Sequence, residues 1–264
     1  ALGGMYANRI HLVSSDKGVG VNLGNLTARQ GDITLDASGK LVVKNSVASG
    51  SLNAKGDGVS LTGEHKAGGA ATLTSTQDLA LKDATLAADG PVSLGSNGKL
   101  SATNSNLTSG KGLTMSASQI GLDGTSRADA AGDVRLSGGD ITNQGQVNTS
   151  GGLALSASAL DNSGKLAAKG RVDAQASRLN NSGNIQGNGV TVHAGTTQNS
   201  GALQSSDALS LTGDALSQSG TLSAGGDMTL SLTGVLKNGG QGKTLSDGLL
   251  QINAGTWTQN GTLS

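Results

Sequence analysis

The sequence predicts an all-β protein, a parallel β-helix with about 20 residues in each turn. One reason is a repeated pattern in which Gly-x-aliphatic is followed, a few residues later, by two aliphatic residues in alternation. Another is the composition, because 44 of the 264 residues are glycine, one is proline, and no segment has the 3.6-residue apolar period of a helix. In the second half of the chain the leading aliphatic residues recur at steps of 19, 19, 18 and 19 residues, at Val147, Leu166, Ile185, Leu203 and Leu222. A short fixed period between glycine-rich turns is typical of a solenoid.

This aliphatic column extends over most of the chain. Its further members are Leu26, Val47, Leu86, Leu107, Ala128, Leu245 and Leu263. The column predicts about 12 turns, stacked about 4.8 Å apart into one rod. We expect the coil to be right-handed, although the period alone does not set its hand. Residues 50–75 and 237–248 depart most from the period, which predicts insertions at corners of the coil.

Individual strands are expected where apolar and small polar residues alternate. Residues 33–37 and 153–157 both alternate with a period of two, which indicates strands with one buried face. A turn of this length has room for three such strands, and the thin core between them would consist of Leu, Val, Ile and Ala, with no Phe. Each turn buries little by itself, so stability should come from stacking. The pattern runs to Ser264 without a polar capping segment, and we therefore expect a longer parent protein.

A second column consists of side-chain amides, each two residues after an aliphatic residue or threonine. Its members are Asn143, Asn162, Asn181, Asn199, Gln218, Asn238 and Asn260. A single Asn before Gly is an ordinary turn signal. Stacked identical turns can instead place such side chains in a ladder, in which each amide bonds to the one above and below. Both interpretations are open from the sequence, and the regular spacing favours a structural ladder.

The composition argues against several classes of function. The 18 basic and 18 acidic residues cancel and form no run, which removes the usual electrostatic signature of proteins that bind nucleic acid or anionic membranes. There is no cysteine, which excludes disulfides and thiolate metal sites. No apolar run approaches the length needed to span a bilayer. We therefore expect no nucleic-acid partner and no stable membrane insertion.

Catalytic and metal-binding residue types are scattered. A β-helical polysaccharide-degrading enzyme would need clustered carboxylates or a metal with a base, and no acidic residues are neighbours in the chain. Asp32, Asp133 and Asp227 each follow a glycine at the start of a strand, which indicates a turn role. Glycine-aspartate fragments occur without the tandem array of calcium-binding repeats. The sequence therefore predicts that the chain is not an enzyme, with no catalytic residue, no metal site and no cofactor.

The histidines and aromatic residues are few and far apart. His11, His65 and His193 are too widely spaced for one solenoid turn to bring them together, and each is expected at the surface. Tyr6 and Trp257 are the two aromatic residues, and we expect both to be packed rather than to form a sugar-binding surface. A flat polar face of a solenoid can still bind through many weak hydrogen bonds, so adhesion stays open.

The opening of the chain is its most specific motif. The run Ala1-Leu2-Gly3-Gly4-Met5-Tyr6-Ala7-Asn8-Arg9-Ile10-His11-Leu12-Val13, continued by Gly18-Val19-Gly20-Val21, resembles the segment after the amino-terminal secretion domain of filamentous haemagglutinin-like exoproteins. These include the contact-dependent growth inhibition effectors of Gram-negative bacteria. Later segments, such as 31–39 and 160–164, resemble the first block of haemagglutinin repeats in that family. The resemblance implies that residues 1–30 are a lead-in segment from an upstream secretion domain and that residues 31–264 are one continuous β-helical rod.

The resemblance also implies a function for this rod. It would be the structural shaft of an exoprotein at the surface of a Gram-negative bacterium, projecting a receptor-binding or toxin region. The secretion domain would engage an outer-membrane partner transporter, and a target-cell receptor would bind another region. None of the family's functional residues maps onto this chain. The alternatives are an adhesin module that itself binds host or bacterial surface ligands and, less favoured, a polysaccharide-degrading β-helix.

Overall fold

The computed structural model of the chain describes residues 4–264, which form two compact units divided after Gly132. Residues 1–3 of the opening motif lie outside the described residues. The expected all-β parallel β-helix is confirmed, and it has about 14 turns at a spacing of about 19 residues, where the sequence predicted about 12 turns of about 20. Every regular element of residues 4–264 is a β-strand, and none is a helix able to cross a bilayer.

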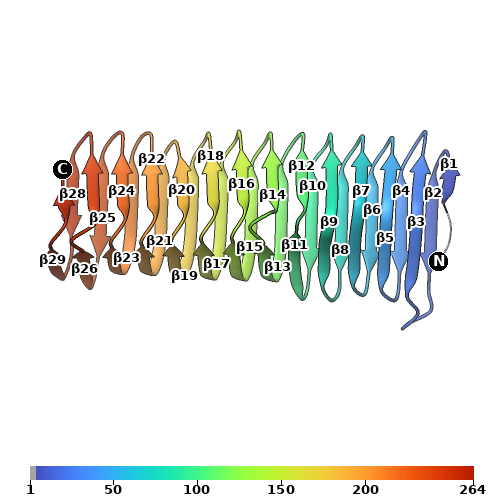
Figure 1. Cartoon of the computed structure of the whole chain (residues 1–264), viewed down its shortest axis with the longest axis horizontal. Helices are drawn as coiled ribbons and strands as arrows, with labels where there is room; N and C mark the ends of the chain where they lie inside the picture. The colour runs from blue at the N-terminus through green and yellow to red at the C-terminus, as the bar shows by residue number, and fades with distance from the viewer. Residues whose placement is uncertain (1–3) are drawn as a thin grey trace. The chain divides into compact units, whose positions relative to one another are not determined.

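The first unit contains strands β1 to β14 (Figure 1). Their bounds are Met5–Ala7 (β1), Ile10–Ser14 (β2), Val21–Ala28 (β3), Ile33–Ala37 (β4), Leu41–Ala48 (β5), Leu52–Gly56 (β6), Val59–Ala67 (β7), Ala71–Ser75 (β8), Leu79–Ala88 (β9), Val92–Ser96 (β10), Lys99–Thr103 (β11), Asn106–Ser109 (β12), Leu113–Leu122 (β13) and Arg127–Ala130 (β14). The opening segment is itself part of the stack, because β1 pairs with β3 and β2 pairs with β4.

The second unit contains strands β15 to β30. Their bounds are Val134–Asn143 (β15), Gln146–Thr149 (β16), Leu153–Asn162 (β17), Lys165–Ala168 (β18), Val172–Asn181 (β19), Asn184–Gly187 (β20), Val190–Asn199 (β21), Ala202–Ser205 (β22), Leu209–Gln218 (β23), Thr221–Ala224 (β24), Met228–Leu232 (β25), Val235–Asn238 (β26), Lys243–Ser246 (β27), Leu250–Asn253 (β28), Thr256–Gln259 (β29) and Thr262–Leu263 (β30).

One turn of the second unit consists of a long bent strand and a short strand. In β17, Leu153 and Leu155 point inward, the alternation is interrupted near Ala157, and inward positions resume at Leu160. The long strand therefore supplies two sides of the core, and the short strand β18 closes the third. Each strand pairs in parallel with its counterpart one turn along, as β17 does with β19 and β19 with β21 (Figure 1).

The core of the second unit is a stack of identical aliphatic positions. Leu166, Ile185, Leu203 and Leu222 lie on successive short strands, pair in register, and are each 0% exposed. Burying such a side chain contributes about 1.5–3 kcal/mol. Because every turn buries its aliphatic residues against the turns on either side, stability accumulates along the stack.

A column of glycines makes the corner between long and short strands tight. A Cβ atom on Gly183 would lie against the carbonyl oxygen of Gly164, one turn earlier. The same clash with the preceding glycine carbonyl occurs at Gly201 and Gly220. The Asn-Ser-Gly pattern of the sequence is therefore required by the close approach of stacked backbones as well as by the turn itself.

The sequence alignment of the aliphatic column is one residue out of register at two turns. Leu26 pairs with Ser46, which is buried, whereas Val47 is 46% exposed. Leu222 likewise pairs with Thr244, which is buried, whereas Leu245 pairs with Ser223. A shift of one residue moves a side chain to the opposite face, and here small polar residues take the inward position.

The irregular segments lie near the two regions that fit the period worst. Pairing of β5 with β7 and of β7 with β9 shifts register, next to Gly63 with its positive φ of 77°. In the second unit, residues 239–242 form an enlarged corner between β26 and β27.

The glycine corner predicts a large cost for a small substitution. Replacing Gly183 by Ala should lower the free energy of unfolding by about 1–3 kcal/mol, because the backbone of the neighbouring turn must move. The matched control is Ser182→Ala, whose side chain is exposed, with an expected change within about 0.5 kcal/mol. Chemical denaturation of both variants measures the difference, and equal stabilities would contradict this role of the glycine column.

Candidate functional site

The most regular polar feature of the second unit is a column of buried side-chain amides. Each is the last residue of a strand, a long one for the first five and the short β26 for the last, and each is at most 1% exposed: Asn143, Asn162, Asn181, Asn199, Gln218 and Asn238. Asn143 and Asn162 are register partners, as are Asn162 and Asn181. Parallel pairing therefore sets the amides directly above one another, about 4.8 Å apart.

Five of these amides are joined in a continuous chain of hydrogen bonds. Asn143 Nδ2 donates to Asn162 Oδ1, and Asn162 Nδ2 donates to Asn181 Oδ1, both at 2.9 Å. Asn181 Nδ2 donates to Asn199 Oδ1 at 2.9 Å, and Asn199 Nδ2 donates to Gln218 Oε1 at 2.7 Å. Each amide thus donates toward the later turn, and every bond runs in the same direction.

The same amides also bind the backbone of the glycine corner. Asn162 Nδ2 lies 3.2 Å from the carbonyl oxygens of both Gly164 and Asn184. Asn199 Nδ2 makes equivalent contacts with the carbonyl oxygens of Gly201 and Thr221, at 3.4 and 3.0 Å. Buried carbonyl groups at a tight corner need donors, and an aliphatic side chain could not supply them.

The column is interrupted between Gln218 and Asn238. Gln218 Nε2 donates to the carbonyl oxygens of Gly220 and Lys243, at 2.7 and 3.0 Å, and Asn238 Oδ1 has no partner among the described residues. The interruption lies at the enlarged corner 239–242. Asn238 Nδ2 then donates to Gln259 Oε1 at 2.9 Å.

Asn260 is therefore not a member of the column, and its sequence assignment is wrong by one residue. Asn238 pairs with Gln259, and Leu236 pairs with Trp257. Gln259 takes the amide position because the enlarged corner changes the spacing of the last turns, while Asn260 is exposed at the corner that follows.

The first unit has an aliphatic column at the corresponding position of its turns. Its buried members are Leu23, Val43, Leu61, Leu81, Ala102 and Leu122. Its amide contacts lie instead on the outer side, where Asn45 Nδ2 donates to Asn25 Oδ1 at 2.8 Å. The two units thus fill this interior position with different chemistry, and they also divide the turn into strands at different places, since Leu86 lies on the long strand β9 whereas Leu166 lies on the short strand β18.

The glycine-aspartate positions fix the backbone of neighbouring turns. Asp32 Oδ1 accepts from the backbone N–H of Ser51 at 2.7 Å, one turn later. Asp133 and Asp227 do the same for the N–H groups of Gly152 and Leu249, both at 2.8 Å. These carboxylates have the structural role that the sequence indicated. Among residues 4–264, no group of three or more His, Cys, Asp or Glu side chains could hold a metal ion.

His65 is a correction to the sequence analysis, because it is 0% exposed rather than on the surface. Its Nε2 lies 2.7 Å from the carbonyl oxygen of Thr62, which can only accept, so Nε2 carries the proton. Nδ1 then accepts from the Ser46 hydroxyl at 2.7 Å. Burial lowers the pKa of His65, and the hydrogen bond to Thr62 opposes this to a smaller extent. His11 and His193 are exposed as expected.

The two aromatic residues are also more exposed than expected. Tyr6 is 68% exposed and Trp257 is 49% exposed. The Arg29 guanidinium lies 4.4 Å from the centre of the Tyr6 ring, which is a cation–π contact. Tyr6 falls on an outward position beside Thr27. Trp257 is in register with the buried Leu236, but it lies on β29, where all four residues are exposed.

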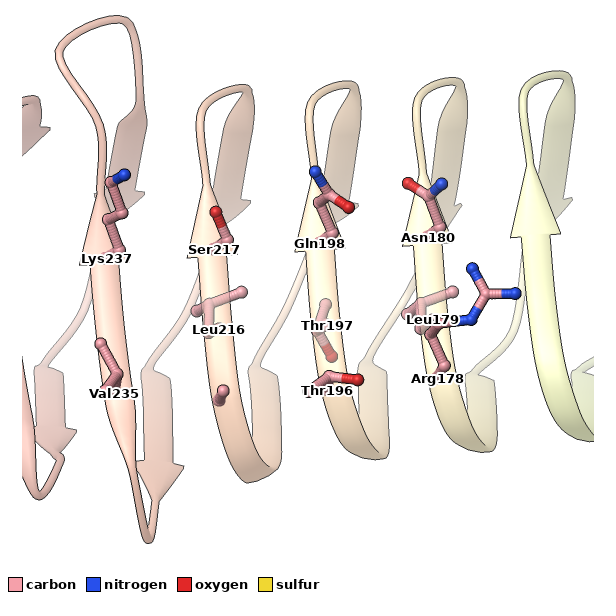
Figure 2. Close-up of a pocket in the computed structure, with 11 residues that line it drawn as sticks. Arg178, Leu179, Asn180, Thr196, Thr197, Gln198, Leu216, Ser217, Val235 and Lys237 are labelled. Atoms are coloured by element: carbon pink, nitrogen blue, oxygen red, sulfur yellow. The ribbon is translucent and has the colours of Figure 1, made fainter.

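The outer side of the amide-bearing strands forms a shallow groove of about 390 Å³. Figure 2 shows its side chains coming from four successive turns, from Arg178 at one end to Lys237 at the other. Asn180, Gln198 and Ser217 are register partners, and their side chains form a row of amide and hydroxyl groups across the strands. The side chains of a second row, Thr196, Ala215 and Val235, are smaller and more apolar than those of the first row. Val235 is 46% exposed.

The lining of this groove contains two basic side chains, Arg178 and Lys237, and acidic side chains lie beside it. Arg178 Nη1 lies 3.5 Å from Asp161 Oδ1 of the preceding turn, and Asp214 accepts a hydrogen bond from the Thr233 hydroxyl at 2.7 Å. The groove can make weak polar contacts with a chain that crosses the strands. No pattern in the sequence indicated this groove, because its rows form only when residues about 19 positions apart are set in register.

Repeat stacking, the glycine corners and the buried amides define this protein as a parallel β-helix built from sequence repeats. The haemagglutinin repeat family matches residues 82–145, 128–231 and 206–264, and repeats of unknown function (DUF5649) match residues 30–95. The chain belongs to the haemagglutinin repeat family. The expected resemblance to the repeat region of filamentous haemagglutinin-like, contact-dependent growth inhibition exoproteins is confirmed.

Three curated relatives illustrate the similarity. The 16S rRNA endonuclease CdiA of Enterobacter cloacae subsp. cloacae is 35% identical over an alignment that covers 100% of this chain and 10% of that protein. The tRNA nuclease CdiA of Escherichia coli (strain NC101) is 64% identical over 34% of this chain and 3% of that protein. The tRNA nuclease CdiA of Yersinia mollaretii is 52% identical over 47% of this chain and 4% of that protein. The chain thus spans a tenth or less of each of these relatives, and no solved structure matches it.

The amide column predicts a measurable contribution to stability. Replacing Asn162, Asn181 and Asn199 together by Ala should lower the free energy of unfolding by at least about 3 kcal/mol, because each lost amide leaves buried carbonyl groups without a donor. The control replaces the outward residues Asn180 and Gln198 by Ala, with changes within about 0.5 kcal/mol each. A denaturant melt in which the triple variant matches the control would make the amides dispensable.

The buried histidine predicts a pH dependence of the first unit. Because the folded state holds the pKa of His65 below its ordinary value, the unfolded chain binds a proton first as the pH falls. The contribution of neutral His65 to the free energy of unfolding should be complete above about pH 6.5 and should decrease as the pH falls below this value. The free energy of unfolding is measured at pH 7.5 and at pH 5 for the wild type and for His65→Leu. Leucine is chosen because Leu86 occupies the paired position in the next turn. The variant should have a flatter pH profile, and identical profiles would count against the histidine as the cause.

Proposed function

We propose that the chain is a length of structural shaft in a secreted exoprotein, which holds a receptor-binding or toxin region away from the producing cell. The observation that supports this most is the regular register of strands β17 to β21 in the second unit. Each long strand pairs over its whole length with the next turn, and the buried amide column adds side-chain bonds between the same turns. Continuous ladders of this kind resist bending and local opening, which is what a spacer requires.

The two units are proposed to continue one another as one rod, with residues 1–30 as lead-in and 31–264 as repeats. The haemagglutinin repeat match at residues 128–231 extends across the division between the units, which supports this arrangement. By family membership, the parent protein would be exported through an outer-membrane partner transporter and displayed on a Gram-negative cell surface. The target-cell receptor would bind elsewhere in the parent protein.

We further propose that this region is not catalytic. The nuclease activities in the relatives' names belong to proteins of which the chain covers a tenth or less. Its own matches are to repeats, and its aspartates at strand starts are occupied with backbone N–H groups. This also argues against the polysaccharide-degrading alternative, which would need free paired carboxylates.

The second candidate function is an adhesin module, and the groove at 178–237 is the observation that favours it. A row of amide and hydroxyl groups beside small apolar residues could bind a surface polymer through several weak contacts. The shaft proposal instead requires that this groove has no specific ligand.

One binding experiment separates the two functions. The folded chain, checked by its β-type circular dichroism, is labelled and titrated onto candidate target bacteria and host cells. The shaft predicts no saturable binding. Saturable binding that is lost on replacing Gln198 and Ser217 by Ala, and kept on replacing the exposed Gln175 by Ala, would overturn the shaft in favour of the adhesin.

A further inference from the structure

A second outer surface of the second unit carries opposite charges on a regular spacing. Arg135, Ala154 and Asp173 are register partners on β15, β17 and β19, on the outer side of the first half of each strand. Arg135 and Asp173 are exposed, and neither makes an ion pair or side-chain hydrogen bond within the described chain. Two strand spacings separate them, about 10 Å, which is too far for them to neutralise one another directly.

The surface is hollowed between these two charges. A depression of about 380 Å³ lies over β17, where Ala154 and Ser156 are small, and Arg135 and Ser137 border it on one side. Asp173 and Gln175 border it on the other. We define these six residues as the Arg–Asp surface. It has a small-residue floor with a cation along one edge and an anion along the opposite edge.

We propose that the Arg–Asp surface binds a second copy of this chain, with the two stacks of turns antiparallel. The relevant symmetry is a two-fold axis parallel to the strands, passing over β17. Rotation about this axis exchanges the turn before β17 with the turn after it. Arg135 therefore faces the partner's Asp173, Asp173 faces the partner's Arg135, and the contact is self-complementary.

The remaining residues fit the same arrangement. Ser137 faces the partner's Gln175, which allows a hydrogen bond on each side of the axis. Ala154 and Ser156 face their own counterparts, and their small size lets the two surfaces approach closely. A two-fold axis along the stack of turns would instead place both arginines at the same level of the stack and leave neither of them opposite an aspartate. Charge therefore selects the antiparallel arrangement.

The expected association is weak and sensitive to salt. Six side chains on each copy cover less area than a permanent dimer buries, and their charges are at the rim of the contact. Screening of the two ion pairs at high ionic strength should loosen the dimer. This inference does not depend on the shaft function, because it concerns a different face and a different partner.

Substitutions that reverse the charge of Arg135 or of Asp173 test the proposal directly. Sedimentation velocity of the 264-residue chain at rising concentration should show a monomer–dimer equilibrium that weakens in 0.5 M salt. Arg135→Asp alone and Asp173→Arg alone should each weaken association at least tenfold, because like charges then face one another. An equimolar mixture of these two variants should associate again as a heterodimer, since each supplies the charge that the other requires.

The control is Arg178→Asp, an exposed charge outside the Arg–Asp surface, which should leave association unchanged. Circular dichroism confirms that all variants are folded. A wild-type chain that stays monomeric throughout would overturn the proposal. So would single variants that associate like the wild type, or a mixture that fails to recover dimerisation.

Discussion

The structure depends on one constraint, the in-register parallel pairing of every turn with the next. Backbone N–H and C=O groups of a turn find their partners in the neighbouring turns, so each corner has to return the chain to the same place. Tight corners need glycine where backbones approach, as at Gly183. Strand starts need an acceptor for the next turn's N–H, as Asp133 provides. The repeated sequence is therefore a consequence of satisfying one set of bonds again and again.

The two units show that this constraint leaves the interior chemistry free. At the same position of the turn, the first unit has aliphatic residues such as Leu81 and the second has amides such as Asn181. An aliphatic column stabilises by burial and tolerates small displacements along the strand. An amide column requires each side chain to meet its neighbour and the corner carbonyls together, so it specifies the register more narrowly. In a stack of similar turns, such specification disfavours a slip of one residue along the strand.

Much of this fold is predictable from the sequence, because period and alternation follow directly from the backbone repeat. The amide positions from Asn143 to Asn238 were also recognisable as a column. Errors arise where corners change length: Val47, Leu245 and Asn260 are each displaced by one residue, and such a displacement reverses the face of a side chain. His65 was missed because a histidine in an aliphatic column carries no mark of burial. The outer surfaces were missed because they combine residues that only exact register brings together.

The amide column also has a direction, since every described bond within it runs from an NH2 group to the oxygen of a later turn. A completed turn therefore ends with a donor group in place, and the turn that follows it in the chain must bring the matching acceptor. A turn added at the carboxyl-terminal side therefore meets an NH2 group that already points toward it. At the amino-terminal end of the column the exposed group is an acceptor instead, and Asn143 Oδ1 has no hydrogen-bond partner among the described residues. The two ends of the amide column are therefore chemically different, because one end presents an acceptor and the other presents donors.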